Sequence, residues 1–324
     1  MHDLRELVRV IEETVTGHRI GPGRYARHLG DADPSPYGVA DAANLLYTVG
    51  KFPRDAEERR AFVDLLRSMQ NREDGLYHDE THHPIHTTAQ CVSALELFDA
   101  TPARKPLVLL DHATPVGIRS FLDGLDWSDR PWTESHKGAG LYTTLTLTYA
   151  VDDAWREAYF DWLFHETDRG SGLLRRGAVP SSNPGALFPH LAGTFHYLFT
   201  IEYAREPIRY PESLIDTCLD LWESVATPLG RSVGFAEIDW VYCMTRARRQ
   251  CGHRFSDVSE ALQAFTDRYV PMLVSLDHQS DPSWNDLHRL FGAVSALAEL
   301  QAALPGYLRT ERPLRLVLDR RPFI

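Results

Sequence analysis

Polar residues recur along this chain of 324 residues at intervals of 45 to 54 positions, each near the start of a helix-like segment. These segments are apolar or rich in small residues, and a more polar helix-like segment lies between each pair. Repeated two-helix units are typical of stacked or closed arrays of helical hairpins. Six hairpins would close into a toroid, with the six polar residues at one mouth. They are Asp41, His86, His136, His190, Glu237 and Asp286.

Hydrophobic periodicity predicts an all-α protein. The helices are expected over residues 3–17, 38–50, 55–70, 84–98, 114–123, 136–150, 153–168, 189–204, 211–222, 237–250, 256–275 and 285–302. Every second segment is rich in Ala, Gly, Thr and Leu, and the alternate segments carry the charges. This division predicts a two-layer (α/α)6 toroid. No Gly/Ser linker divides the chain, so residues 1–324 are expected to form one domain, with the tail from Arg309 to Ile324 on its surface.

Charge and composition argue against several classes of partner. The net charge of −11 disfavours non-specific binding to nucleic acid or to an anionic membrane. No apolar run approaches the roughly 20 residues of a spanning helix. The first residues lack the order of a signal peptide, and the four cysteines lack CxxC spacing and are expected to be reduced core thiols, so the cytoplasm is the expected location. The oligomeric state stays open.

The densest polar segment runs from residue 77 to residue 90 and holds four of the 15 histidines. We expect it to supply acid/base and hydrogen-bonding groups at the mouth of the toroid. A solvated loop with incidental histidines is one alternative, and a zinc or iron site is a weaker one. Since no His-x-His or HExxH spacing occurs, no metal and no other cofactor is expected. The candidates are His86 as a catalytic group and Tyr77, His83 and Gln90 as binding groups.

Further candidates lie in residues 132–140, 188–197, 234–242 and 284–288. Asp239 and Arg246 share a helical face, so a buried ion pair is the alternative to an acid/base role for Asp239. Ser135 and Asp286 could simply cap helices, and His196 is expected to be a core group. The catalytic candidates are His136, Glu237 and Asp239. The binding candidates are Asp41, Trp132, Glu134, Lys137, His190, Trp240, Tyr242, Trp284, Asp286 and His288.

One loop and the helix after it resemble a known repeat. Residues 68–77 read Ser-Met-Gln-Asn-Arg-Glu-Asp-Gly-Leu-Tyr, and Thr87-Thr88-Ala89 follow at the start of a helix. This is similar to the Gln-x-x-x-Asp-Gly, then Thr-Ala, repeat of α/α-toroid enzymes. Two branches share that repeat: a carbohydrate-active branch of unsaturated-uronyl hydrolases, uronate lyases and sugar epimerases, and a prenyltransferase and squalene-cyclase branch. The resemblance implies the toroid and does not specify the reaction.

Differences from the prenyltransferase and squalene-cyclase branch favour the carbohydrate-active branch. The Asp-x-Asp-Asp motif of terpene cyclases is absent, and Asp239 with Cys243 resembles only part of the prenyltransferase zinc triad. A polar mouth with Trp and Tyr suits a sugar, which Lys137, Arg175 or Arg176 could serve if it is acidic. We therefore expect a carbohydrate-active enzyme performing hydrolysis, β-elimination or epimerisation on a small sugar-derived substrate. A terpenoid cyclase or prenyltransferase-like enzyme and a non-catalytic binding toroid are the alternatives.

Overall fold

The computed structural model describes residues 1–180, 184–224 and 229–324, and its regular structure is almost entirely helical, which confirms the all-α prediction. Two pairs of short strands, β1 with β4 and β2 with β3, accompany the helices. The elements are β1 (His2–Asp3), α1 (Arg5–Gly17), β2 (Arg19–Gly21), β3 (Arg24–Tyr25), α2 (Pro36–Thr48), α3 (Ala56–Met69), α4 (Pro84–Leu97), η1 (Leu107–His112), α5 (Pro115–Asp123), α6 (Pro131–Leu147), α7 (Asp153–Glu166), α8 (Pro184–Ala204), α9 (Pro211–Glu223), α10 (Ala236–Gln250), α11 (Phe255–Ser275), α12 (Leu287–Ala303), β4 (Leu308–Arg309) and η2 (Val317–Asp319).

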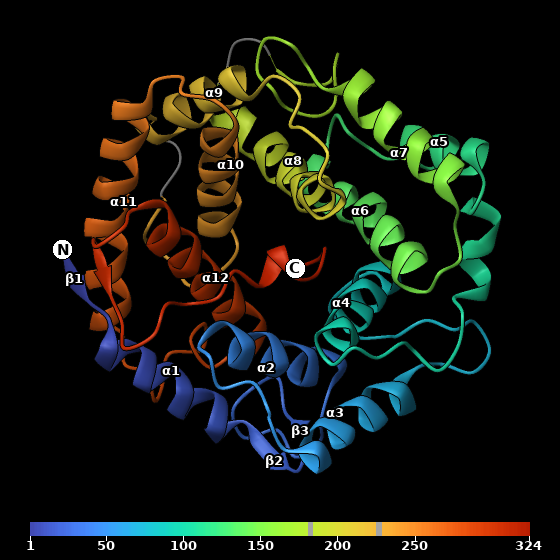
Figure 1. Cartoon of the computed structure of the whole chain (residues 1–324), viewed down its shortest axis with the longest axis vertical. Helices are drawn as coiled ribbons and strands as arrows, with labels where there is room; N and C mark the ends of the chain where they lie inside the picture. Colours follow the sequence, from blue (N-terminus) through green and yellow to red (C-terminus); the bar gives the residue numbers. More distant parts are fainter. Residues whose placement is uncertain (181–183, 225–228) are drawn as a thin grey trace.

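The even-numbered helices contact one another in a closed order. α2 packs on α4, α4 on α6, α6 on α8, α8 on α10, α10 on α12, and α12 returns to α2. Figure 1 shows these helices around the centre and the odd-numbered helices outside them. This arrangement is compatible with a toroid. None of the helices in the described ranges is long and apolar enough to cross a bilayer.

The two sets of helices differ in how much of their surface is buried. α4 buries every residue from Ile85 to Leu95, as expected of a helix surrounded by protein. α1 buries only Leu7, Ile11 and Val15, which form one stripe at helical spacing. The burial of α4 and α1 therefore agrees with the expected division into inner helices rich in small residues and outer helices that carry the charges.

The loop motif that resembles the toroid repeat has a structural role. The Gln70 side chain donates through Nε2 to the carbonyl oxygens of Gly75, at 2.7 Å, and Arg104, at 2.8 Å. The Tyr77 amide donates to Thr88 Oγ1 at 2.9 Å, which ties the loop to the first turn of α4. Gly75 has a φ of +77° and lies against the Lys105 backbone, so a side chain at that position would clash.

The same backbone geometry recurs before α8, where the sequence letters differ. The Leu174 amide donates to Thr194 Oγ1 at 2.9 Å, as Tyr77 does to Thr88. Gly172 has a φ of +71°, and its amide donates to the carbonyl oxygen of Asp168 at 2.8 Å. The structure therefore contains this loop geometry twice, whereas the sequence motif is clear only in the loop before α4.

Two helices, α6 and α8, begin five residues earlier than expected. α6 begins at Pro131, because a proline suits the first helical position, and Ser135 is consequently inside the helix and not its cap. Ser135 Oγ donates to the Trp132 carbonyl oxygen at 2.9 Å. α8 begins at Pro184 and includes Pro189 within its length. His136 therefore lies in the second turn of its helix.

The expectation that the tail runs over the surface holds for residues 309–313, most of which are exposed, and was wrong for the end of the tail. Arg321, Phe323 and Ile324 are buried, and Figure 1 shows this end of the described chain at the centre of the ring. The Arg315 amide donates to the Thr48 carbonyl oxygen at 2.9 Å, and Thr143 Oγ1 donates to the Pro322 carbonyl oxygen at 2.6 Å. The tail thus supplies apolar side chains to the space between the inner helices, where an unfilled axis would lose packing contacts.

Candidate functional site

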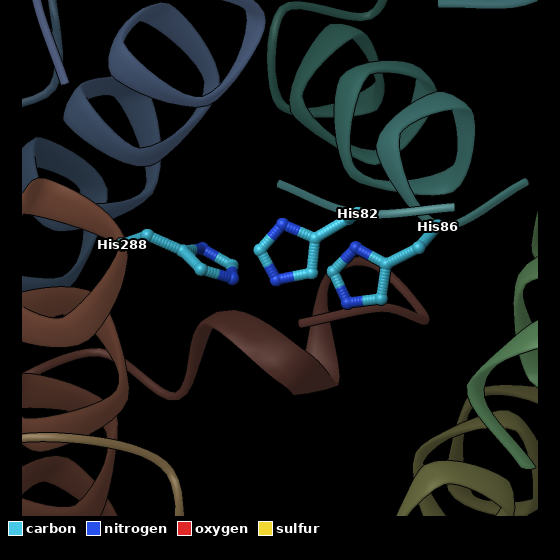
Figure 2. A group of neighbouring side chains, drawn as sticks. All are labelled: His82, His86 and His288. Carbon is cyan, nitrogen blue, oxygen red and sulfur yellow. The ribbon is translucent and has the colours of Figure 1, made fainter. Parts of the chain in front are cut away.

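Five histidines form one cluster, and they come from the inner helices α4, α6, α8 and α12 and from the loop before α4. They are His82, His86, His136, His196 and His288, and we call them the histidine cluster. The ring centroid of His86 lies 4.6 Å from that of His82, 4.9 Å from that of His136 and 5.9 Å from that of His288. The His136 and His196 centroids are 6.1 Å apart. Figure 2 shows three of these rings facing one another between segments distant in the sequence.

Helix α2 supplies the groups that hold two of these rings. Tyr37 Oη lies 2.5 Å from His86 Nδ1, and Asp41 Oδ2 accepts a hydrogen bond from His288 Nδ1 at 3.0 Å. Gln90 Nε2, one turn after His86 on α4, donates to the other Asp41 oxygen. Tyr37, Asp41, His86 and His288 are all buried, so these bonds fix the rings in an environment that excludes water.

A loop ion pair borders the cluster. Arg27 donates through Nε and Nη2 to the two oxygens of Asp286, at 2.9 and 3.0 Å, and through Nη1 to Thr81 Oγ1 at 2.7 Å. Asp286 also accepts from the His288 amide at 3.0 Å, as the N-cap of α12. The capping role considered for Asp286 from the sequence is therefore present, and the residue also positions Arg27 beside the histidine cluster.

Four histidines of the cluster, His82, His86, His136 and His196, are held in the neutral form. Burial lowers the pKa of His82 to about 3, that of His136 to about 2 and that of His196 to about 3. Burial lowers the pKa of His86 well below its usual range, and the neighbouring imidazoles lower it further. Desolvation penalises the charged imidazolium, and several imidazoles in one place cannot all be charged. Lone pairs on ring nitrogens are therefore available at neutral pH.

The tail forms one side of the cluster. The Phe323 ring packs on His86 with centroids 4.9 Å apart and on Phe199 with centroids 5.6 Å apart. Arg321 Nη1 reaches Gln90 Oε1 at 3.5 Å, while its Nε and Nη2 have no hydrogen-bond partner among the described residues. Burial lowers the pKa of Arg321 to about 9. A buried guanidinium with free donors is a group that an anion would complement.

A second polar group lies at the start of α10. Both carboxyl oxygens of Asp239 are buried and have no hydrogen-bond partner in the described part of the chain. Burial raises the pKa of Asp239 well above its usual range, and the charge of Glu237 raises it further. Burial also raises the pKa of Glu237, whose Oε1 accepts from Ser232 Oγ at 3.0 Å. Phe235, one turn before Asp239, packs on the His288 ring with centroids 4.6 Å apart.

Replacing Asp239 with asparagine is expected to change the pH dependence of stability. Because burial raises the folded pKa, the carboxyl is protonated in both states below its unfolded pKa of 3.8. As the pH rises from there toward the folded pKa, the unfolded state ionises first, which lowers the free energy of unfolding of the wild type. The free energy of unfolding of the Asp239→Asn variant should therefore gain on that of the wild type by about 1.4 kcal/mol per pH unit in that window. Urea unfolding at pH 5 and pH 7 measures this. Asp220→Asn, at an exposed position of α9, is the control, and equal pH profiles for all three proteins would exclude the buried, protonated state.

The structure brings together several of the sequence candidates and places others elsewhere. Asp41, His86, Gln90, His136, His288 and Asp286 are in or beside the histidine cluster. Lys137 donates to Glu134 at 2.6 Å, and Arg175 binds Glu166 at 2.9 Å, so neither cation is free for a ligand. His83 Nδ1 accepts from the Ile85 amide as the N-cap of α4. Trp132 packs edge-on against Phe188.

Other candidates belong to the core. The indole Nε1 of Trp240 donates to the Cys218 carbonyl oxygen at 2.8 Å, and that of Trp284 donates to Thr14 Oγ1 at 2.8 Å, on α1. His190 is buried, with Nδ1 3.1 Å from the Leu174 carbonyl oxygen. The remaining members of this group are Tyr77, which is buried behind the loop motif, and Tyr242, which packs on Phe195 and under Arg246.

The Asp239–Arg246 ion pair, which was the alternative to an acid/base role for Asp239, is not formed. Arg246 instead binds Glu299, Glu202 and Asp319, and Asp239 keeps no partner among the described residues. Asp239 lies in the first turn of α10, whereas Arg246 lies near its last turn and reaches the neighbouring helices and the tail. A shared helical face therefore did not mean a shared contact.

Sequence reasoning missed several residues of the site. His196 is buried and its Nδ1 lies 2.8 Å from Ser135 Oγ, as expected of a core histidine, but the contact of its ring with His136 was not foreseen. Tyr37 and Arg321 carried no signal of their own, because one follows a proline-rich turn and the other lies in a tail without periodicity. His82 was visible only as one histidine of a dense loop.

Comparison with protein-family models, with curated proteins and with solved structures gave no match. The functional argument therefore rests on the geometry and chemistry of the two polar groups described above. Fold likeness alone would in any case leave the reaction open, because one fold carries many activities.

Proposed function

We propose that this protein is an (α/α)6-toroid enzyme that acts on a small, sugar-derived substrate by hydrolysis, β-elimination or epimerisation. Asp239 is the proton donor of this proposal, and the histidine cluster with Asp41 and Gln90 binds the substrate. The single observation that carries the proposal is the state of Asp239: a carboxyl buried without a hydrogen-bond partner in the described residues and favoured in its protonated form.

Such a carboxyl is unfavourable for stability, which is the reason to look for a function. Burying a polar group without a partner destabilises a fold by about 1–3 kcal/mol. A carboxyl whose pKa is raised holds its proton to a higher pH, and general acid catalysis requires an acid that keeps its proton until the transition state. The contact between Phe235 and His288 places the start of α10 beside the histidine cluster.

The charges near the cluster favour a sugar acid over an isoprenoid diphosphate. A diphosphate requires several free cations or a bound magnesium ion. Arg27 is paired with Asp286 and Lys137 with Glu134, which leaves Arg321 as the cation whose unpaired donors support the proposal. The Arg321 guanidinium can bind one carboxylate of a sugar acid, and the protein amide and carboxylate groups around it can form hydrogen bonds with the sugar hydroxyls.

A thermal-shift screen tests this proposal with the full chain. The panel contains neutral monosaccharides, oligosaccharides, uronates and prenyl diphosphates. A ligand at about 100 times its dissociation constant stabilises the folded state by about 2.7 kcal/mol, which gives a clear increase in Tm. We expect uronates to give the largest increase and Arg321→Met to abolish it. A shift with prenyl diphosphates alone would favour the prenyltransferase-like alternative, and no shift with any compound would contradict the proposal.

A further inference from the structure

Three members of the histidine cluster come from three separate segments and present nitrogen atoms to one another. His82 lies in the loop before α4, His86 in the first turn of α4, and His288 in the first turn of α12. One ring nitrogen of each lies within 4.8 Å of those of the other two. Figure 2 shows the three rings side by side. His86 and His288 are buried, and His82 is half-buried at the edge of the group.

The hydrogen bonds of His288 leave its outer nitrogen free. Asp41 Oδ2 lies 3.0 Å from His288 Nδ1, and an ionised carboxylate can only accept, so Nδ1 carries the hydrogen. The Nε2 atom of that tautomer has a lone pair. Asp41 is itself held by Gln90. A carboxylate that fixes the tautomer and orientation of a histidine is the usual outer partner of a metal-binding imidazole.

The other two rings also have a hydroxyl oxygen within hydrogen-bond distance of Nδ1. Thr81 Oγ1 lies 2.7 Å from His82 Nδ1 and 2.5 Å from Asp79 Oδ1. Because the Thr81 hydroxyl gives its hydrogen to the Asp79 carboxylate, it accepts from His82 Nδ1. Tyr37 Oη lies 2.5 Å from His86 Nδ1 and 3.4 Å from Thr87 Oγ1, so it can accept from the histidine and donate to the threonine. All three Nε2 atoms then keep their lone pairs.

We propose that His82, His86 and His288 bind one divalent zinc-class ion through their Nε2 atoms, with its fourth position open. A tetrahedral ion about 2.0–2.1 Å from each nitrogen holds the nitrogens about 3.3 Å apart. Because the nitrogens now lie within 4.8 Å of one another, each pair needs to approach by at most about 1.5 Å. His82 is in a loop and half-buried, which allows this adjustment. Three imidazoles and an open position are the ligand set of a catalytic rather than a structural zinc site.

Ring stacking is the competing explanation of the same geometry. The His82 and His86 rings are nearly parallel, with an interplanar angle of 17°. Stacking explains why two rings lie together, but it does not explain why Nδ1 of all three rings meets an oxygen atom that can accept its hydrogen. The two explanations differ in one measurable respect, which is whether the protein takes up one metal ion per chain.

Metal uptake is tested with the full chain and the metal ions alone, so the result does not depend on the reaction proposed above. The protein is stripped with dipicolinate and titrated with Co²⁺, whose visible absorption reports tetrahedral coordination, and Zn²⁺ is then added in competition. We expect one equivalent of Co²⁺ per chain, displaced by Zn²⁺, and a higher Tm in the Zn²⁺-bound protein.

Variants locate the ion. His288→Ala and His82→Ala should each weaken metal binding more than about 100-fold, and Asp41→Asn, which changes the hydrogen-bond partner of His288 Nδ1, by about 10–100-fold. His18→Ala is the matched control, because His18 is buried and bonds the Ala26 carbonyl oxygen and not a residue that holds the three rings. If the buried substitution at His288 prevents folding, His82→Ala in the half-buried loop gives the same test. A wild type without a saturable equivalent of metal, or cluster variants that bind as tightly as the wild type, would overturn the proposal.

Discussion

Replacing Arg246 with alanine is expected to destabilise the protein by about 3–5 kcal/mol, because removal of one partner leaves a buried charge uncompensated. The Arg246 side chain is 1% exposed and that of its partner Glu299 is 3% exposed. Arg246 also binds Glu202 at 3.3 Å and Asp319 of the tail, so a single guanidinium connects three inner helices to the tail. Urea unfolding at neutral pH measures the loss.

Arg249 offers a matched control on the same helix. Its Nη2 lies 3.6 Å from the other oxygen of Glu299, but its side chain is 40% exposed. Solvent screens such a pair, so Arg249→Ala should change stability by no more than about 1 kcal/mol. Similar losses of stability in Arg246→Ala and Arg249→Ala would show that burial does not determine how strongly these ion pairs stabilise the fold. If Arg246→Ala loses stability but its tail stays protected from proteolysis, the Arg246–Asp319 ion pair does not hold the tail in place.

The helices could be predicted because their signal is local. Apolar residues at helical spacing mark one face of α1, and prolines mark the first turns of α4 and α9. The distinction between inner and outer helices followed from composition, because one set is rich in Ala, Gly, Thr and Leu and the other carries the charges. Errors arose where a start signal was overlooked, as at Pro131, which placed the beginning of α6 several residues too late and turned Ser135 into an expected cap.

The site could be predicted only in part, because its contacts join distant residues. Asp41 and His288 are 247 positions apart, and nothing in either local sequence indicates the other. The tail carries no periodicity that would show that Phe323 packs on His86. The repeat of polar residues did place Asp41, His86 and His136 near one another. It could not distinguish them from His190, whose hydrogen bond to a loop carbonyl depends on the fold of residues 168–174.

The second large effect is expected at Asp239. Asparagine has the size of a protonated aspartate but cannot give up a proton, so Asp239→Asn should reduce kcat by about 100-fold to 10,000-fold. The same substitution removes a carboxyl that burial disfavours in its charged form, so the variant should unfold no more easily than the wild type at pH 7. A residue that lowers stability while supporting turnover is typical of an active site.

The most direct test is the turnover rate of Asp239→Asn on the substrate that the ligand screen identifies, measured at pH 7 beside its Tm. Asp220→Asn, at an exposed position of α9, again serves as the control. The proposal predicts a fall in kcat of at least about 100-fold for Asp239→Asn with an unchanged or higher Tm, and no change in either quantity for Asp220→Asn. Full turnover by a folded Asp239→Asn variant would contradict the assignment of Asp239 as the proton donor.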